Sequence, residues 1–388
     1  MNDSAHPSRI DNLLILRGLC AFGVLLIHTI DISNPWFIEN GFYIKPYLQD
    51  TDLGIIISDI LWPLNAVNFV LIFFALSGYL MGKIYLLGRY ELSRKGTYHF
   101  YKNRFLRIAP LFYFNLLILM ALAGDWSYFI GVNWTNLLGD IFFINNLTPV
   151  KLNFVTWSIS YEMQYYLLCP LLFWFFYRYS KHNFIPLLIS IFAMGAYAYW
   201  ASSQQKNSFA KIFAHTWIFM SGFLANYLIL FLHKKLNLKC NLFFRLLGFL
   251  SFAAASVSYW VLRNDGHPFL AQVSLCAFAV LSIVLLELPM HANHSRITKT
   301  VGIPLTWLGQ ISYGVYLWHY PIIKSIMHNP DYLGFYVMTY SQNAHGAFPA
   351  WLVANLMLLG LVVIYTLTLS TITFFLVEQK FRPGLYKK

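Results

Sequence analysis

The sequence is poor in charge, and above all in acidic charge. Only 11% of its 388 residues are charged, with 15 Asp and Glu against 27 Lys and Arg. A soluble domain usually contains about 25% charged residues. Hydrophobic residues make up 58% of the chain and aromatic residues 19%. So few polar groups could not cover a water-exposed surface, so the composition excludes a soluble globular fold.

Cysteine is equally scarce. The four cysteines lie far apart, at Cys20, Cys169, Cys240 and Cys276, and no CxxC pair is present. We therefore expect buried or reduced thiols rather than a disulfide framework. The histidines do not fall at metal-ligand spacings either, so the sequence predicts no metal site.

What the sequence does contain is a series of apolar segments of roughly 18 to 25 residues, the length that crosses a hydrocarbon core of about 30 Å. They predict an all-α, polytopic membrane helical bundle with about ten transmembrane helices. The expected spans are Asn12–Asp31, Ile60–Leu87, Ile108–Ala123, Tyr161–Tyr177, Phe184–Ala201, Ile212–Leu232, Leu242–Leu262, Phe269–Leu288, Leu305–Ile326 and Pro349–Val377. The segment Trp134–Leu147 is shorter and contains Asp140, which favours an interfacial or re-entrant piece.

The positive charges are distributed unevenly between the loops. With the N-terminus inside, 20 of the 27 Lys and Arg residues fall on one side of the membrane and five on the other. This asymmetry predicts that both termini are cytoplasmic. It also accounts for the net charge of +12 without a nucleic-acid partner. No loop is long enough for an appended soluble domain, so we expect residues 1–388 to form a single membrane domain.

The first apolar segment contains Arg17 and His28. Charged groups inside a span cost about 2.5–3.5 kcal/mol on insertion scales, which makes them functional candidates. They are eleven positions apart, which corresponds to about three helical turns, so both side chains face one direction, about 16 Å apart. Arg17 would bind an anionic or dipolar ligand, and His28 would act as a general base. Asp31, one turn further, could orient His28. Alternatively, Arg17 snorkels and His28 is a packing residue.

Three basic residues, Lys102, Arg104 and Arg107, precede the third span. Arg104 and Arg107 share one helical face, and such a pair can grip phosphates. The alternative is ordinary cytoplasmic charge in contact with anionic lipids.

Two later stretches combine a titratable group with aromatic residues. In TWSISYEMQYYL (Thr156–Leu167), Glu162 could bind acceptor hydroxyls or orient an imidazole. Trp157 and Tyr161 could stack on a sugar, or simply form an interfacial belt. In WLGQISYGVYLWHYPI (Trp307–Ile322), we expect His319 and Tyr316 to contact the substrate; the alternative for His319 is a packed histidine.

Six stretches in this order resemble the acyltransferase 3 family of membrane O-acyltransferases, whose bacterial members modify O-antigens, exopolysaccharides and related glycans. They are the Arg17-x10-His28 helix, FFALSGYLMG (Phe73–Gly82), FYKNRFLRIAPLFY (Phe100–Tyr113), TWSISYEMQYY (Thr156–Tyr166), ISYGVYLWHYPI (Ile311–Ile322) and VEQKFRP (Val377–Pro383). The resemblance implies a multi-pass protein of the bacterial inner membrane. It implies an acyl-CoA co-substrate, acetyl-CoA by family habit, and a carbohydrate acceptor.

The resemblance also implies roles for particular residues. Catalysis would fall to His28, Arg17 and Glu162, and the acyl-CoA phosphates to Arg104, Arg107 and Lys102. His28 would deprotonate the acceptor hydroxyl or accept the acyl group first. His319, Trp157, Tyr161 and Tyr316 would contact the acceptor. Glu162 and His319 would either hold the acceptor or tune His28.

Two features depart from the family pattern. Asn68 stands where an acidic residue is common, and we assign it no role. We expect no SGNH-type domain beside the membrane domain, so transfer would be completed by this domain or by a partner. A glycan transporter or exporter is the main alternative function, and a non-catalytic sensor or scaffold is the second. The paired broken helices and inverted repeats of many transporters are not apparent here.

Overall fold

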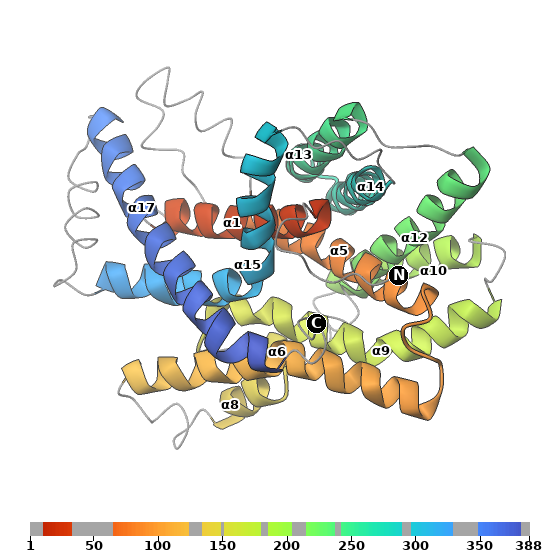
Figure 1. Cartoon of the computed structure of the whole chain (residues 1–388), viewed down its shortest axis with the longest axis horizontal. Coiled ribbons are helices and arrows are strands. Elements are labelled where there is room, and N and C mark those ends of the chain that lie inside the picture. The colour runs from red at the N-terminus through yellow and green to blue at the C-terminus, as the bar shows by residue number, and fades with distance from the viewer. Residues whose placement is uncertain are drawn as a thin grey trace.

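The computed structural model describes residues 11–32, 65–123, 134–148, 151–179, 185–203, 215–236, 242–288, 296–328 and 348–381. Every regular element in these ranges is helical (Figure 1). The long helices are α1 (Asn12–Ile32), α5 (Ala66–Leu86), α6 (Arg94–Ala123), α9 (Trp157–Tyr179), α10 (Ile185–Ser203), α12 (Thr216–Leu236), α13 (Leu242–Asn264), α14 (Pro268–Glu287), α15 (Arg296–His328) and α17 (Phe348–Thr373). The short ones are α8 (Trp134–Ile141), η1 (Asn145–Leu147), η2 (Phe154–Thr156), the π-helix η3 (Phe374–Glu378) and α18 (Gln379–Phe381).

Each expected span overlaps one of the ten long helices, which confirms the all-α class. In the described part of the chain, six helices are long and apolar enough to cross a membrane: α1, α5, α6, α13, α14 and α17. The protein is therefore a multi-pass membrane protein. The helix α6 begins at Arg94, well before the expected Ile108. Lys and Arg are good helix formers, so the helix continues into the basic segment although its hydropathy falls.

The short segment expected between Trp134 and Leu147 is the helix α8 followed by η1, too short to span a bilayer. A buried polar network ties it to the start of α9. The side-chain amide of Asn145 donates to Asp140 Oδ1 at 2.6 Å and to Thr156 Oγ1 at 2.7 Å. Its oxygen accepts from Ser160 Oγ at 2.7 Å. These bonds fix the first turns of α9, on which several candidate site residues lie.

Two helix pairs cross at glycines. Figure 1 shows α1 next to α15, and α5 near α12. A Cβ atom on Gly309 of α15 would lie 1.9 Å from the carbonyl oxygen of Leu14, and one on Gly222 of α12 would lie 1.7 Å from that of Ala75. Only glycine permits such close backbone approach, which is the usual way for membrane helices to gain packing contact.

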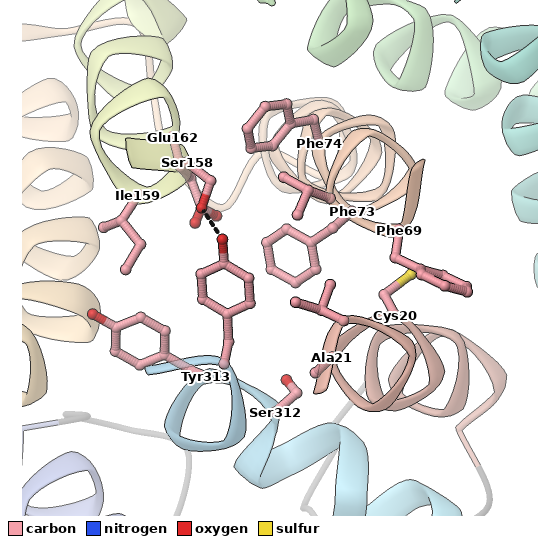
Figure 2. A pocket seen from close by; sticks show the side chains of 13 residues that line it. Cys20, Ala21, Phe69, Phe73, Phe74, Ser158, Ile159, Glu162, Ser312 and Tyr313 are labelled. Atoms are coloured by element: carbon pink, nitrogen blue, oxygen red, sulfur yellow. Dashed lines mark hydrogen bonds between the residues drawn. The ribbon is translucent and has the colours of Figure 1, made fainter. Parts of the chain in front are cut away.

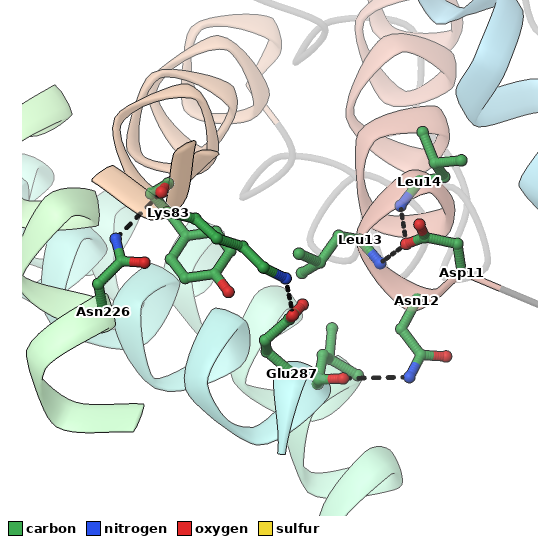
Figure 3. Close-up of polar contacts among 9 residues, drawn as sticks. Asp11, Asn12, Leu13, Leu14, Lys83, Asn226 and Glu287 are labelled. Carbon is green, nitrogen blue, oxygen red and sulfur yellow. Dashed lines mark hydrogen bonds and ion pairs between the residues drawn. The ribbon is translucent and has the colours of Figure 1, made fainter. Parts of the chain in front are cut away.

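A polar cluster joins the end of the bundle at which α1 begins and α5 and α14 end (Figure 3). Lys83 of α5 forms an ion pair with Glu287 of α14. The side-chain amide of Asn12 donates to the carbonyl oxygen of Leu286 at 3.1 Å, and Asp11 caps the first turn of α1. The cluster fastens α1, α5 and α14 together at this end.

Candidate functional site

A small cavity lies between α1, α5, α9 and α15 (Figure 2). Its volume is about 30 Å³, enough for about one water molecule. Its walls are mostly apolar, and Figure 2 shows Glu162 and Ser158 on one side of it and Cys20 and Phe69 on another. The lining residues are Cys20, Ala21, Val24, Phe69, Val70, Phe73, Phe74, Ser158, Ile159, Glu162, Ser312, Tyr313 and Tyr316. An acyl group would fit only if these helices moved apart.

One face of α1 carries Arg17 and His28, and the middle of this face lies against the cavity. Cys20, Ala21 and Val24 lie between the two on this face and line the cavity. We call these five residues the α1 stripe. The structure thus places Arg17 and His28 on one face of α1, as their spacing predicts, at the two ends of a stripe whose middle lines the cavity.

Arg17 is buried, with 8% of its surface exposed. Its guanidinium carbon lies 5.1 Å from the centre of the Phe73 ring, which lines the cavity. Its Nε atom is buried and has no hydrogen-bond partner among the described residues. A buried cation without an acceptor costs free energy, so this end of the stripe is suited to an anionic or dipolar ligand.

His28 is hydrogen-bonded to His319 of α15. The distance from His28 Nδ1 to His319 Nε2 is 2.9 Å. The ring planes differ by 7° and the centroids are 5.2 Å apart. The centroid separation equals the N···N distance plus the distance from each ring centre to its nitrogen. The two centres and the two nitrogens therefore lie on one line, and the rings are edge to edge in one plane rather than face to face. His319 is fully buried, and its Nδ1 lies 3.2 Å from the Val315 carbonyl oxygen.

Glu162 is a buried carboxylate on the cavity wall, 7% exposed. Two hydroxyl groups donate to the same oxygen, Oε1: that of Tyr166 at 2.5 Å and that of Ser77 at 3.0 Å. Its other oxygen, Oε2, makes no hydrogen bond to any residue in the described ranges, so it can accept from a ligand. The carboxylate is thus held from one side by α5 and α9.

Tyr316 and Ser158 place two hydroxyl groups on the cavity wall, 2.6 Å apart. Both hydroxyls can donate to the Val155 carbonyl oxygen, Tyr316 at 2.9 Å and Ser158 at 3.2 Å. The Tyr316 ring centre is 5.7 Å from that of His319. These hydroxyls therefore connect the Glu162 side of the cavity to the histidine pair.

The basic residues of α6 differ in their surroundings. Lys102 is exposed, whereas Arg104 and Arg107 are half-buried. The guanidinium carbon of Arg104 lies 6.0 Å from the ring centres of both Phe100 and Tyr166. Its Nε and Nη1 atoms are buried without hydrogen-bond partners in the described part of the chain. Arg104 is thus connected to Glu162 through Tyr166, and two of its guanidinium nitrogens have no protein acceptor in these ranges.

Trp157 and Tyr161 do not line the cavity. They pack instead beside it, against Phe74 and against His215, the residue before α12. The ring centre of His215 is 4.4 Å from the ring centre of Tyr161, 6.0 Å from that of Trp157 and 5.7 Å from that of Phe74. The Nδ1 atom of His215 is buried and has no hydrogen-bond partner within the described ranges. We call these four residues the aromatic box.

Several site residues escaped the sequence analysis. His215 lies in no recognised motif, and its only signal is an imidazole at the start of an apolar segment. Ser77, Ser158 and Tyr166 do lie within the recognised motifs, where hydroxyl groups inside apolar helices are the signal. The side chain of Asp31, expected to orient His28, lies outside what the structure describes. Asn68 is buried, and its amide lies 3.4 Å from the Ser256 carbonyl oxygen.

Fold and site together define a membrane-embedded helical bundle with a small cavity against the middle of the α1 stripe, a buried arginine at one end of the stripe and an imidazole pair at the other. The chain matches the acyltransferase 3 family, described as an acyltransferase domain, over residues 10–375. It belongs to this family and is a membrane acyltransferase.

The curated relatives are O-acetyltransferases. The chain is 27% identical over 279 residues to the peptidoglycan O-acetyltransferase OatA of Listeria monocytogenes, covering 65% of this chain and 44% of that protein. It is 25% identical over 276 residues to the O-acetyltransferase OatA of Staphylococcus aureus, covering 65% and 45%. A third relative, YrhL of Bacillus subtilis, is 23% identical over 333 residues, covering 79% and 48%. The chain therefore spans about half the length of these relatives. No solved structure matches it.

Proposed function

We propose that this protein transfers an acyl group, most simply acetyl, from cytosolic acyl-CoA to a hydroxyl of a cell-envelope carbohydrate. The observation that carries the proposal is the α1 stripe. One end of the stripe carries a buried arginine whose Nε has no hydrogen-bond partner in the described ranges, and the other end carries a hydrogen-bonded imidazole. The cavity lies against the middle of the stripe, in a chain of the acyltransferase 3 family. The names of the relatives support O-acetylation and make peptidoglycan glycan one candidate acceptor. O-antigen, exopolysaccharide or a lipid-linked sugar are the others.

In the proposed reaction the acyl-CoA phosphates bind Arg104 and Arg107, with Lys102 nearby. The pantetheine arm then reaches past Arg17 into the cavity, which brings the thioester toward His28. His28 removes the proton of the acceptor hydroxyl as its oxygen attacks the thioester carbonyl, or it first accepts the acyl group itself. General-base catalysis of this kind contributes roughly 10²–10⁴ in rate.

The remaining residues would hold the acceptor. We assign Glu162 to an acceptor hydroxyl in the cavity, through the carboxylate oxygen that has no hydrogen-bond partner in the described ranges. Tyr316 and Ser158 are assigned to the same region. Trp157 and Tyr161, together with His215, would stack on and hydrogen-bond a sugar beside Phe74. Aromatic faces and free polar atoms in one place suit a carbohydrate, which has both apolar ring faces and hydroxyl groups.

The proposed topology has ten crossings with both termini in the cytoplasm of a bacterium, and residues 1–388 forming one membrane domain. In this orientation α1 and α15 run outward, so Arg17 lies nearer the cytosol and His28 nearer the outside. The donor is anionic and too polar to cross a bilayer, whereas envelope glycans are often exposed outside. The stripe would thus connect the compartments of the two substrates.

The test uses purified protein reconstituted in lipid and incubated with radiolabelled acetyl-CoA and an oligosaccharide of peptidoglycan type. Wild type is compared with His28→Ala and with Arg104→Ala/Arg107→Ala. We expect label to be transferred to the oligosaccharide or released from CoA by wild type, and neither by His28→Ala. A folded wild type that neither binds nor consumes acetyl-CoA would contradict the proposal. Glycan movement without acetyl-CoA consumption would favour a transporter.

A further inference from the structure

The two ring nitrogens of His319 face different partners, and this difference determines which nitrogen carries the proton. Its Nδ1 lies 3.2 Å from the Val315 carbonyl oxygen. A carbonyl oxygen can only accept, so a neutral His319 donates from Nδ1. Its Nε2 must then be the unprotonated nitrogen. The reverse assignment would point a lone pair at the carbonyl oxygen and lose that bond.

This assignment passes to His28. The His28 Nδ1 atom lies 2.9 Å from His319 Nε2, in the common plane of the two rings. Since His319 Nε2 accepts, His28 Nδ1 must carry the hydrogen. A neutral imidazole has one N–H, so His28 Nε2 holds a lone pair. That atom makes no hydrogen bond to any residue in the described ranges.

We infer that His319 is a positioning residue that fixes His28 in the Nδ1-protonated tautomer, so that Nε2 of His28 is the nitrogen that reacts. This inference rests on the proposed function and assigns its reacting atom. The chain of partners runs from the Val315 carbonyl through His319 to His28. The same logic, in which a second group orients a catalytic histidine through its far nitrogen, operates in serine hydrolase triads.

His319 is well placed to hold this arrangement. It is fully buried on α15, and both of its ring nitrogens are engaged, so neither is free for an acceptor sugar. The backbones of α1 and α15 are locked together below it by the close approach at Gly309. The His28 ring is also contacted edge-on by Tyr320, with centroids 6.0 Å apart. Its orientation is therefore defined before any substrate binds.

Both versions of the reaction use the same atom. In the one-step version the acceptor O–H bond breaks, the proton goes to His28 Nε2, and the oxygen bonds to the thioester carbon. The C–S bond breaks, and the CoA sulfur takes the proton from the imidazolium. In the two-step version Nε2 bonds to the carbonyl carbon and CoA leaves as thiolate. The acceptor oxygen then takes the acyl group from Nε2, and its proton goes to the thiolate.

A matched pair of variants tests the positioning role in the full-length reconstituted enzyme. His319→Gln keeps an oxygen that can accept from His28 Nδ1, whereas His319→Met fills a similar volume without a strong acceptor. We expect kcat for acetyl transfer to fall at least about 100-fold in His319→Met and at most about 10-fold in His319→Gln. The KM for acetyl-CoA should stay within about 3-fold in both, because ground-state binding is unchanged. Equal activity of the two variants would overturn the inference.

A spectroscopic measurement reads the tautomer without any turnover. Protein labelled with ¹⁵N-histidine is reconstituted in lipid, and the His28 signals are identified by their loss in His28→Gln. We expect a protonated Nδ1 and an unprotonated Nε2 at His28 in wild type, and a mixture of tautomers in His319→Met. A protonated Nε2 in wild type would overturn the inference even if the enzyme transfers acetyl groups. Conversely, the expected spectrum in a protein without transferase activity would contradict only the proposed function.

Discussion

At one end of the α1 stripe His28 is hydrogen-bonded to His319, which is in turn bonded to a backbone carbonyl. At the other end Arg17 is just as deeply placed, but its Nε has no hydrogen-bond partner in the described part of the chain. Both ends carry a polar side chain in an apolar bundle. Only the imidazole end is complete without a ligand.

The difference separates two kinds of work that a buried polar group can do. A group that must react in a fixed geometry is oriented in advance by its neighbours, since orientation supplies much of the rate enhancement. A group that must bind a charged ligand is left without a competing partner, and the cost of its burial is recovered when the ligand arrives. The cavity is small in this state, about 30 Å³, so the ligand must also separate the helices.

The largest effect should come from the completed end. We expect His28→Ala to lower acetyl transfer by about 10³-fold or more, because it removes the reacting group. The control is His267→Ala, which changes an exposed histidine before α14. Both variants are assayed for transfer and for thermal unfolding. Wild-type activity in a folded His28→Ala protein would refute the role of this end in the chemistry.

Substitution at the Arg17 end should weaken donor binding without lowering the stability of the ligand-free protein. We expect Arg17→Met to raise the KM for acetyl-CoA by about 10- to 100-fold, the value of a charged hydrogen bond. It should leave Tm of the ligand-free protein unchanged or higher, because an unpaired buried charge is removed. Arg17→Lys keeps the charge but loses the planar guanidinium, and should lie between the two. A clear fall in Tm with unchanged KM would show that Arg17 is structural.

The α6 arginines extend the comparison to the donor phosphates. We expect Arg104→Met to raise the KM for acetyl-CoA by about 10-fold, and Arg107→Met by a similar or smaller factor. The matched control is Arg94→Met, at the exposed start of the same helix. Binding is measured with acetyl-CoA and with acetyl-pantetheine, which lacks the nucleotide phosphates. The variants should differ from wild type for acetyl-CoA only; equal losses for both donors would contradict phosphate binding.

Much of the fold can be predicted from the apolar segments alone, because a helix that crosses a bilayer must be apolar over most of its length. The segments predict ten helices, and the chain has a helix at each. The beginning of α6 could not be predicted in this way, because a basic helix that emerges into water has no hydropathy signal. The network at Asn145 also lies beyond prediction, because it depends on side chains that meet only in the folded chain.

The site was predictable along single helices and not between them. The spacing of Arg17 and His28 places them on one face of α1, because helical periodicity is a local property. The bond between His28 and His319 joins residues on different helices, and no periodicity indicates it. His215 was missed for the same reason: its three aromatic partners come from two other helices, α5 and α9.

The aromatic box should give a moderate effect on the acceptor side. We expect His215→Phe, which keeps the ring packing and removes both nitrogens, to raise the KM for the oligosaccharide by about 5- to 10-fold, the value of one hydrogen bond. His215→Asn retains a polar atom near the position of Nδ1 and should recover part of this loss. The KM for acetyl-CoA is the internal control and should not change. A change in the KM for acetyl-CoA without a change in the KM for the oligosaccharide would show that the aromatic box contacts the donor and not the acceptor.

The smallest effect should come from the polar cluster, which lies at the same end of α1 as Arg17 and contains the ion pair between Lys83 and Glu287. Lys83 and Glu287 are 37% and 23% exposed in their side chains, so water screens much of their attraction. We therefore expect a coupling free energy of at most about 1 kcal/mol between them. It is measured by a double-mutant cycle with Lys83→Met, Glu287→Gln and the double variant.

The same variants also test whether the paired charges at this end of the bundle only stabilise the fold, while Arg17 binds the ligand. If so, all three variants should keep the wild-type KM for acetyl-CoA, in contrast to Arg17→Met, while Tm falls by a few degrees. A rise in KM that matches that of Arg17→Met would mean that the ion pair belongs to the donor path. The presence or absence of a hydrogen-bond partner would then not distinguish structural from ligand-binding charges in this bundle, because the Lys83–Glu287 ion pair and Arg17 would both affect donor binding.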